Sequence, residues 1–275
     1  MRITFLSDNK TENSKCTAEW GLSILVESKG KKLLFDVGAS GIFADNAESL
    51  GIDLAKVDAA AISHGHYDHT EGMERFCGLN CDAPIYIHKE AIGESYALDK
   101  NGEIEDVDYG IRWSGEFKKS VAPRLILTEG VTKINDNMTL VGNVPLLDEY
   151  PMTETFFRRS DDGWRADPMD HEQFLVVEEE RGIYIISGCS HKGVMSIIYR
   201  VKELFAGKPI IAFIAGMHLY TLSGEKQREI VNAICGLGVE WVFPVHCTGM
   251  EAIIMFKENL GDRCVAASAG KSYEC

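Results

Sequence analysis

Four potential metal ligands lie within six residues of this chain, directly after an apolar stretch typical of a buried strand. The stretch is Val57 to Ile62, and the ligands that follow it are His64, His66, Asp68 and His69. On an extended strand end, side chains at positions i, i+2 and i+4 project to one side, and the following turn can bring His69 round to join them. Crowded titratable groups repel one another unless a cation compensates, and neutral imidazoles with a carboxylate suit zinc. The segment therefore predicts one or two Zn²⁺ ions, with Mn or Fe ions as alternatives.

Two apolar stretches later in the chain end in a similar way, in a short turn that carries histidine or cysteine. Ile183 to Ile186 leads to Cys189 and His191, and Val239 to Phe243 leads to His246. Because the carboxyl ends of parallel strands line one crevice, we expect these side chains to join the first cluster as metal ligands. For Cys189 the alternative is a small core side chain, which is how a free cysteine often behaves.

Three other histidines are more ambiguous. His218 follows the apolar stretch Ile210 to Ile214, which predicts a substrate-facing acid or a partner of a metal ligand, with ordinary packing as the alternative. His171 precedes a strand instead of following one, so a ligand role and a packing role both stay open. His88 ends a short stretch and is followed by charged residues, which indicates a solvated surface histidine.

The charge balance restricts the partners of this chain. Lysine and arginine total 28 against 42 aspartates and glutamates, a formal net charge of −14. Such a surface repels polyanions, so we expect a small-molecule substrate and no nucleic acid. The apolar runs fall far short of the ~20 residues that cross a bilayer, and the first residues lead into no signal-peptide core. We therefore expect a cytoplasmic protein with reduced cysteines and no membrane partner, the oligomeric state being left open.

Short β-branched runs and segments of helical period share the chain, which is the pattern of an α/β fold. Strands are predicted at residues 3–6, 22–26, 33–35, 57–62, 85–87, 125–127, 174–177, 183–186, 210–214 and 239–243. Helices are expected over Lys192 to Phe205, whose apolar residues gather on one face, and after Gly249. No linker or repeat divides the chain, so we expect one domain over residues 1–275. The least regular stretch, residues 93–170, predicts a lid-like segment.

At the level of motifs, the chain resembles the metallo-β-lactamase superfamily. The resemblance is carried by the histidine-rich segment, by Leu34 to Gly38, and by the motifs 188–191 (GCSH), 216–219 (GMHL), 246–249 (HCTG) and 20–23 (WGLS). The later motifs are similar to the branch of 7,8-dihydropterin-6-methyl-4-(β-D-ribofuranosyl)aminobenzene 5'-phosphate synthase-like metal-dependent hydrolases. The resemblance implies a four-layer αβ/βα sandwich with one or two metal ions at the sheet edge.

The resemblance also implies a set of metal ligands. His64 and His66 would bind the first metal, Asp68 and His69 the second, and His246 would close the second site.

Departures from the family pattern concern the remaining ligands. Cys189 stands in place of the usual bridging aspartate, and either His171 or His191 completes the first site. Asp36 would brace the histidine segment from behind.

These residues predict a metal-dependent hydrolase, or a related transferase, that uses a metal-activated hydroxide on a small, phosphorylated or unphosphorylated, pterin- or ribosyl-type substrate. Asp68 would bind metal and orient the nucleophile, and His218 or His191 would protonate the leaving group. Lys192 and the pair Arg158 and Arg159 are candidate phosphate clamps, although a solvated charge run is the alternative for the arginines. One alternative function is a metal-binding sensor or carrier without hydrolytic activity. The other is a phosphodiesterase or nuclease on the same fold, which the acidic charge disfavours.

Overall fold

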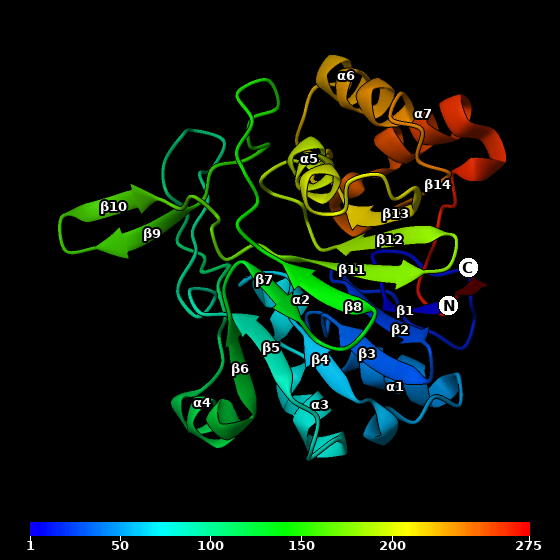
Figure 1. The fold of residues 1–275 in the computed structure, drawn as a ribbon. Helices are drawn as coiled ribbons and strands as arrows, with labels where there is room; N and C mark the ends of the chain where they lie inside the picture. Colours follow the sequence, from blue (N-terminus) through cyan, green and yellow to red (C-terminus); the bar gives the residue numbers. More distant parts are fainter. The chain divides into compact units, whose positions relative to one another are not determined.

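In the computed structural model, which describes residues 1–275, the apolar runs of the sequence form two main sheets, each in its own compact unit. The N-terminal unit comprises residues 1–129, 155–171 and 268–275, and the C-terminal unit comprises residues 130–154 and 172–267. Each unit contains one main sheet and several helices (Figure 1), which confirms the α/β class. The expectation of a single domain stays a prediction.

The sheet of the N-terminal unit has seven strands in the order β15-β1-β2-β3-β4-β5-β6. Its strands are β1 (Arg2–Ser7), β2 (Ser23–Ser28), β3 (Lys31–Phe35), β4 (Ala59–Ala61), β5 (Ile85–His88), β6 (Leu125–Thr128) and β15 (Ser272–Glu274). Neighbours from β15 to β3 are antiparallel, and those from β3 to β6 are parallel. The strands predicted for the first half of the sequence are all confirmed.

The helices of this unit share one apolar core with the sheet. They are α1 (Ile42–Ser49), α2 (Tyr67–Thr70), α3 (Met73–Leu79) and α4 (Gly115–Val121), with 3-10 turns η1 (Leu54–Lys56) and η2 (Ala122–Arg124). Phe43 of α1, Phe76 of α3 and Phe117 of α4 belong to a single cluster with buried residues of the strands. A two-stranded hairpin, β9 (Phe157–Ser160) and β10 (Gly163–Ala166), completes the unit (Figure 1).

The sheet of the C-terminal unit has six strands in the order β14-β13-β12-β11-β8-β7. Its strands are β7 (Val131–Lys133), β8 (Met138–Val141), β11 (Phe174–Glu179), β12 (Gly182–Ser187), β13 (Ile210–Gly216) and β14 (Trp241–Val245). β12, β13 and β14 are parallel, and the other neighbours are antiparallel. The strands β12 and β13 are buried almost throughout. This burial explains why their sequences are continuous apolar runs and do not alternate between apolar and polar residues.

Three amphipathic helices pack on this sheet: α5 (Val194–Leu204), α6 (Gly224–Cys235) and α7 (Met250–Leu260) (Figure 1). Ile197 of α5, Val231 of α6 and Phe256 of α7 share one core cluster with alternate residues of β12 and β13. Two 3-10 turns, η3 (His246–Thr248) and η4 (Gly261–Arg263), flank α7. The alternation of strand and helix predicted for this half is confirmed.

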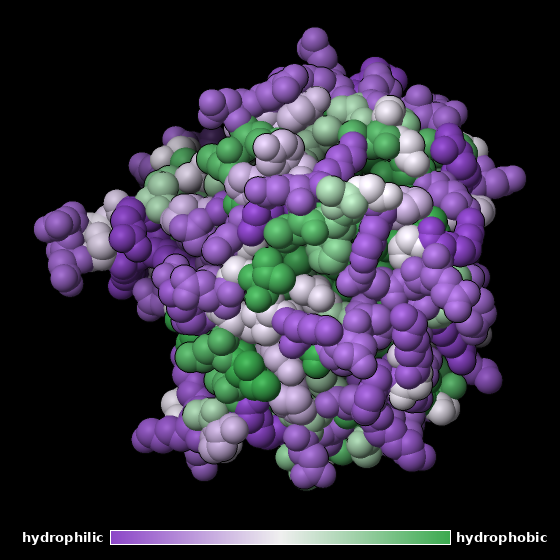
Figure 2. Space-filling model, viewed as in Figure 1, coloured by the Kyte–Doolittle hydropathy of each residue, from purple (hydrophilic) through white to green (hydrophobic).

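The stretch expected to be irregular, residues 93–170, holds α4 and the strands β6 to β10, and its role as a lid stays a prediction. None of the helices has the length and apolarity needed to span a bilayer. On the face shown in Figure 2, hydrophilic residues predominate and apolar residues form separate patches.

The packing of α5 makes a testable prediction. Ile197 is fully buried in the core of the C-terminal unit, whereas Tyr199, two residues on, is 56% exposed. Ile197→Ala removes apolar contacts and leaves a cavity, so we expect it to lower the free energy of unfolding by about 2–5 kcal/mol. Tyr199→Ala should change that free energy by no more than about 0.5 kcal/mol. Urea denaturation of both variants tests this, and equal losses would show that the face of α5 is assigned wrongly.

Candidate metal-binding residues

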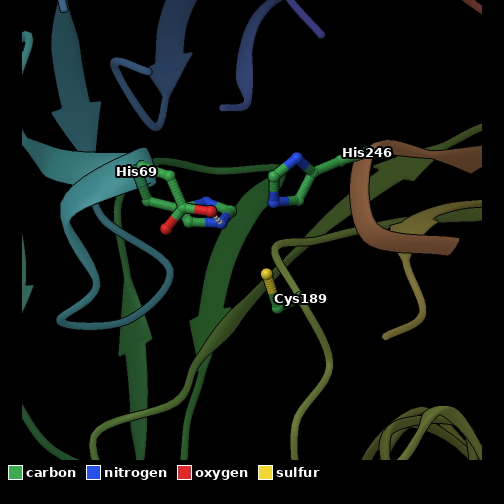
Figure 3. A group of neighbouring side chains, drawn as sticks. His69, Cys189 and His246 are labelled. Carbon is green, nitrogen blue, oxygen red and sulfur yellow. Dashed lines mark ion pairs between the residues drawn. The ribbon is translucent and has the colours of Figure 1, made fainter. Parts of the chain in front are cut away.

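The histidine-rich segment of the N-terminal unit runs from the end of β4 into α2 and gathers its four predicted ligands. The ring centroids of His64 and His66 lie 4.6 Å apart, and those of His64 and His69 lie 4.3 Å apart. Oδ2 of Asp68 lies 3.9 Å from Nε2 of His69, whose position is drawn in Figure 3. All four side chains are buried. The spacing argument is therefore confirmed as far as the grouping of these side chains is concerned.

Asp36, directly after β3, holds two of these rings through one carboxylate. Its Oδ2 accepts a hydrogen bond from Nδ1 of His69 at 2.6 Å and another from the Ser63 hydroxyl at 2.7 Å. Because that hydroxyl donates to Asp36, it accepts from Nδ1 of His64, which lies 2.9 Å away. Both rings therefore carry their proton on Nδ1 and present the lone pair of Nε2, the nitrogen that a metal would take.

The backbone of Asp36 is strained to hold this carboxylate in place. Its φ of +59° lies in the left-handed region, which is uncommon for a residue other than glycine. The peptide N–H of Asp36 donates to Ala61 O at 2.9 Å, and its Oδ1 accepts from the peptide N–H of Ser63 at 2.7 Å. Such strain persists only where the surroundings fix it, so the fold itself positions the carboxylate.

His66 is held through Nε2 of its ring, whereas His64 and His69 are held through Nδ1. Its Nε2 lies 3.2 Å from Oγ of Ser95, and the ring packs on Phe156 with centroids 4.4 Å apart. Nδ1 is therefore the nitrogen that His66 would offer to a metal.

His171 belongs to the same unit, and both of its ring nitrogens are used inside it. Nδ1 accepts from the peptide N–H of Gly65 at 3.1 Å, and Nε2 lies 3.3 Å from Oδ2 of Asp167. Burial lowers the pKa of His171, so the ring is neutral. Burial alone would raise the pKa of Asp167, but hydrogen bonds from His171 and Arg158 hold that pKa well below its usual range. Asp167 is thus an ionised acceptor, and Nε2 of His171 is the donor.

In the C-terminal unit, the parallel strands β12 and β14 carry their terminal side chains to one edge of the sheet. Cys189 follows β12, and His246 follows β14 (Figure 3). Sγ of Cys189 lies within 4.8 Å of a ring nitrogen of His246 and also within 4.8 Å of a ring nitrogen of His191. All three are buried, so the prediction that these strand ends converge is confirmed within this unit.

A buried carboxylate also holds the turn after β12. Oε1 of Glu172 accepts from the peptide N–H of His191 at 2.5 Å, and Oε2 accepts from the peptide N–H of Lys192 at 2.9 Å. Burial raises the pKa of Glu172 to about 7, against the effect of these two donors. The bonds fix the backbone that carries His191.

His218 follows β13 and lies beside the same turn. Its Nε2 is 2.6 Å from Oε2 of Glu154, and its ring centroid is 4.5 Å from that of His191. Burial alone would lower the pKa of His218, but hydrogen bonds with Cys247 and Glu154 raise it to about 10. Burial alone would raise the pKa of Cys247, but a hydrogen bond with Cys189 and the nearby histidines His246 and His218 hold it well below its usual value. His218 therefore keeps a proton on the ring that faces the Glu154 carboxylate.

The strand before the histidine-rich segment, β4, lies in the seven-stranded sheet, and β12 to β14 lie in the six-stranded one. One expectation from the sequence is wrong. His88 is not a solvated surface residue, because β5 is an inner strand between β4 and β6 and the side chain is only 3% exposed.

Sequence reasoning missed most of the residues that hold the candidate ligands in place. Glu154 and Glu172 reach His218 and the Cys189 turn across 64 and 19 residues respectively. No local pattern signals such pairings. Asp167 and His171 form an i, i+4 pair whose charge and spacing were visible, but the segment between them is not helical.

The donors present in the two units fit a divalent transition metal. Imidazole nitrogens of fixed tautomer, a carboxylate and a thiolate are the ligands that borderline ions such as Zn²⁺ prefer. Hydrogen bonds from the far side of the ligand rings to carboxylates, as at His69, are the usual support for metal-bound histidine.

Comparison with known proteins gives consistent matches. The model of the metallo-beta-lactamase superfamily matches residues 20–203, more than half of the chain. The chain is 33% identical, with a TM-score of 0.84, to the crystal structure of Tm1679, a metal-dependent hydrolase of the beta-lactamase superfamily; the match covers 100% of this chain and 99% of that one. The α/β metallo-β-lactamase-like fold expected from the sequence is thereby confirmed.

Two curated relatives come from Methanocaldococcus jannaschii. One is an uncharacterized protein, 30% identical over 91% of this chain and 92% of its own length. The other is 7,8-dihydropterin-6-methyl-4-(beta-D-ribofuranosyl)-aminobenzene-5'-phosphate synthase, 26% identical over 98% of this chain and 94% of its own length.

The role of Asp36 can be tested without any metal. Three donors point at the Asp36 carboxylate, and Asp36→Asn replaces one of its two oxygens with an NH2 group, which cannot accept a hydrogen bond. We expect the metal-free variant to lose about 1–3 kcal/mol of unfolding free energy. Asp45→Asn, which changes an exposed aspartate of α1, is the matched control and should stay within about 0.5 kcal/mol of the unmodified protein. An equal effect of the two substitutions in urea denaturation would contradict the role of Asp36.

Proposed function

Because the chain belongs to the metallo-β-lactamase superfamily, we propose that it is a metal-dependent hydrolase, or a related transferase, of small phosphorylated substrates of the pterin or ribosyl type. The observation that carries the proposal is the pair of hydrogen bonds through which one buried carboxylate, Asp36, orients the lone pairs of two neighbouring histidines. A surface histidine cluster has no need of such a support, whereas a metal centre does.

The proposed ligands divide between two ions, with Zn²⁺ as the first choice. His64, His66 and His191 would hold the first ion, and Asp68, His69 and His246 would hold the second. Cys189 would take the place of the bridging carboxylate, which its closeness to both His191 and His246 supports. His191 is preferred to His171 for the first ion because both ring nitrogens of His171 are engaged within its own unit.

Ions held there would lower the pKa of a water molecule toward ~7 and stabilise an oxyanion that develops during attack. The side chains of the protein supply the remaining chemistry. Asp68 would orient the attacking water, since its carboxylate lies beside His69 in the ligand cluster. His218 would protonate the leaving group, because Glu154 and Cys247 keep a proton on its ring.

The substrate class is supported by the relative named as a dihydropterin ribofuranosyl-aminobenzene phosphate synthase, which matches nearly the whole chain. Lys192, next to His191, is the proposed phosphate-binding cation. Arg158 is a poor candidate for that role, because its guanidinium already donates to Asp167 and to the carbonyl of Glu90.

Metal content is the first test of this proposal. We expect the purified protein to retain one or two divalent transition ions after dialysis, and His69→Ala to weaken their binding by more than about 10-fold. His88→Asn, which removes a buried imidazole outside the proposed ligand set and keeps an acceptor for the peptide N–H of Glu90, is the control and should keep its metal. Elemental analysis distinguishes these cases. Equal metal content in the His69 and His88 variants would remove the basis of the proposal.

Activity is the second test. Metal-reconstituted protein should hydrolyse at least one class in a panel of phosphomonoesters, phosphodiesters, lactones and thioesters, and chelation should abolish that activity. The acidic charge predicts that small esters are cleaved and nucleic acids are not. A fully loaded protein that cleaves no member of the panel would instead favour the sensor or carrier function, in which protein ligands fill the coordination shell.

A further inference from the structure

A continuous series of hydrogen bonds, partly buried at Arg158 and buried beyond it, connects the β9–β10 hairpin to the histidine-rich segment of the same unit. Arg158, on β9, donates through Nε to Oδ2 of Asp167 at 2.5 Å. The same carboxylate oxygen accepts from Nε2 of His171 at 3.3 Å. Nδ1 of His171 in turn accepts from the peptide N–H of Gly65 at 3.1 Å. The series therefore ends on the peptide between His64 and His66.

The middle of the series is rigid. Asp167 is 4% exposed, its peptide N–H donates to Phe156 O at 2.7 Å, and its Oδ1 accepts from the peptide N–H of Met169 at 2.9 Å. Met169 adopts a left-handed backbone with φ of +55°, which is costly unless the surroundings impose it. Asp167 is thus a fixed anchor for the ring of His171.

Arg158 also constrains the backbone of residues 90–91, which packs closely against Gly65. A Cβ atom on Gly65 would lie 2.1 Å from Ala91 O, so only glycine allows this close approach. The residue before Ala91 is held in turn, since Nη1 of Arg158 donates to Glu90 O at 3.0 Å. Arg158 therefore acts on Gly65 from two directions, through His171 and through the backbone of residues 90–91.

We propose that His171 is a positioning residue that fixes the Gly65 peptide, and with it the rings of His64 and His66, and that it is not itself a metal ligand. This inference rests on the proposed function, because it concerns the ligands of the same metal. It extends that function to Asp167 and Arg158, which would set metal affinity without touching the ion.

Two observations support this role over ligation. A neutral histidine has one donor and one acceptor nitrogen, and in His171 the acceptor faces Gly65 and the donor faces Asp167. Ligation through either nitrogen would break one of these buried bonds. Moreover, Gly65 joins His64 to His66 in the chain, and their ring centroids lie 4.6 Å apart, so a shift of the Gly65 backbone would disturb both rings.

The two nitrogens of His171 can be tested separately. Asparagine places an oxygen where Nδ1 lies and so keeps the acceptor for Gly65. Glutamine reaches the place of Nε2 and keeps the contact with Asp167 but loses that acceptor. We expect Zn²⁺ affinity, measured by competition with a chelating indicator, to decrease in the order His171→Asn, His171→Gln, His171→Leu. The leucine variant should bind about 10- to 100-fold more weakly than the unmodified protein.

A metal ligand would give a different order. If Nε2 of His171 bound the ion, glutamine would retain more affinity than asparagine, and the asparagine variant would lose metal as severely as His69→Ala. Either result overturns the inference while leaving the proposed function intact. Failure of the unmodified protein to bind metal at all would instead overturn the proposed function.

Neighbouring arginines on β9 provide a matched pair for the outer part of the series. Arg158→Gln removes the donors to Asp167 and Glu90 O, whereas the guanidinium of Arg159 stacks over Tyr96 and Trp164 and makes neither bond. We expect Arg158→Gln, and likewise Asp167→Asn, to weaken Zn²⁺ binding about 10-fold or more. Arg159→Gln should leave it unchanged. The absorption spectrum of the Co²⁺-loaded protein should shift in Arg158→Gln and not in Arg159→Gln, and identical affinities and spectra in the two variants would contradict the role of Arg158.

Discussion

The hydrogen bonds of the Asp36 carboxylate are the constraint on which the rest of the candidate centre depends. One buried anion orients His69 directly and His64 through the hydroxyl of Ser63. Both imidazoles are thereby locked as the tautomer that exposes Nε2, before any ion is present. The cost is a left-handed backbone at Asp36, which the parallel strands β3 and β4 enforce through the hydrogen bond from the peptide N–H of Asp36 to Ala61 O.

Carboxylates that accept hydrogen bonds also support the other candidate ligands. Glu172 accepts two peptide N–H groups at the turn of His191, Glu154 accepts from His218, and Asp167 accepts from His171. In each unit, then, carboxylates hold the histidines predicted from the sequence or the backbone that carries them, and of these carboxylates only Glu154 is partly exposed. Such supports fix ring orientation, which metal affinity depends on as strongly as on the ligands themselves.

Local spacing accounts for what the sequence could predict. His64, His66, Asp68 and His69 are close in sequence, so a strand end and one turn suffice to gather them, and the strands were marked by their apolar runs. The supporting carboxylates lie far away in sequence, and only tertiary structure pairs them with their histidines. His88 was misjudged for a related reason, because burial at the end of β5 depends on its neighbours β4 and β6 and not on the charged residues that follow it.

The central claim concerns where two protons lie, and it can be measured directly. Two-dimensional ¹⁵N–¹H NMR of histidine side chains in the ¹⁵N-labelled, metal-free protein reports the tautomer of each ring. With His64→Gln and His69→Gln used to assign the signals, this account predicts that both rings are neutral and protonated at Nδ1. Rings protonated at Nε2, or exchanging between tautomers, would contradict it.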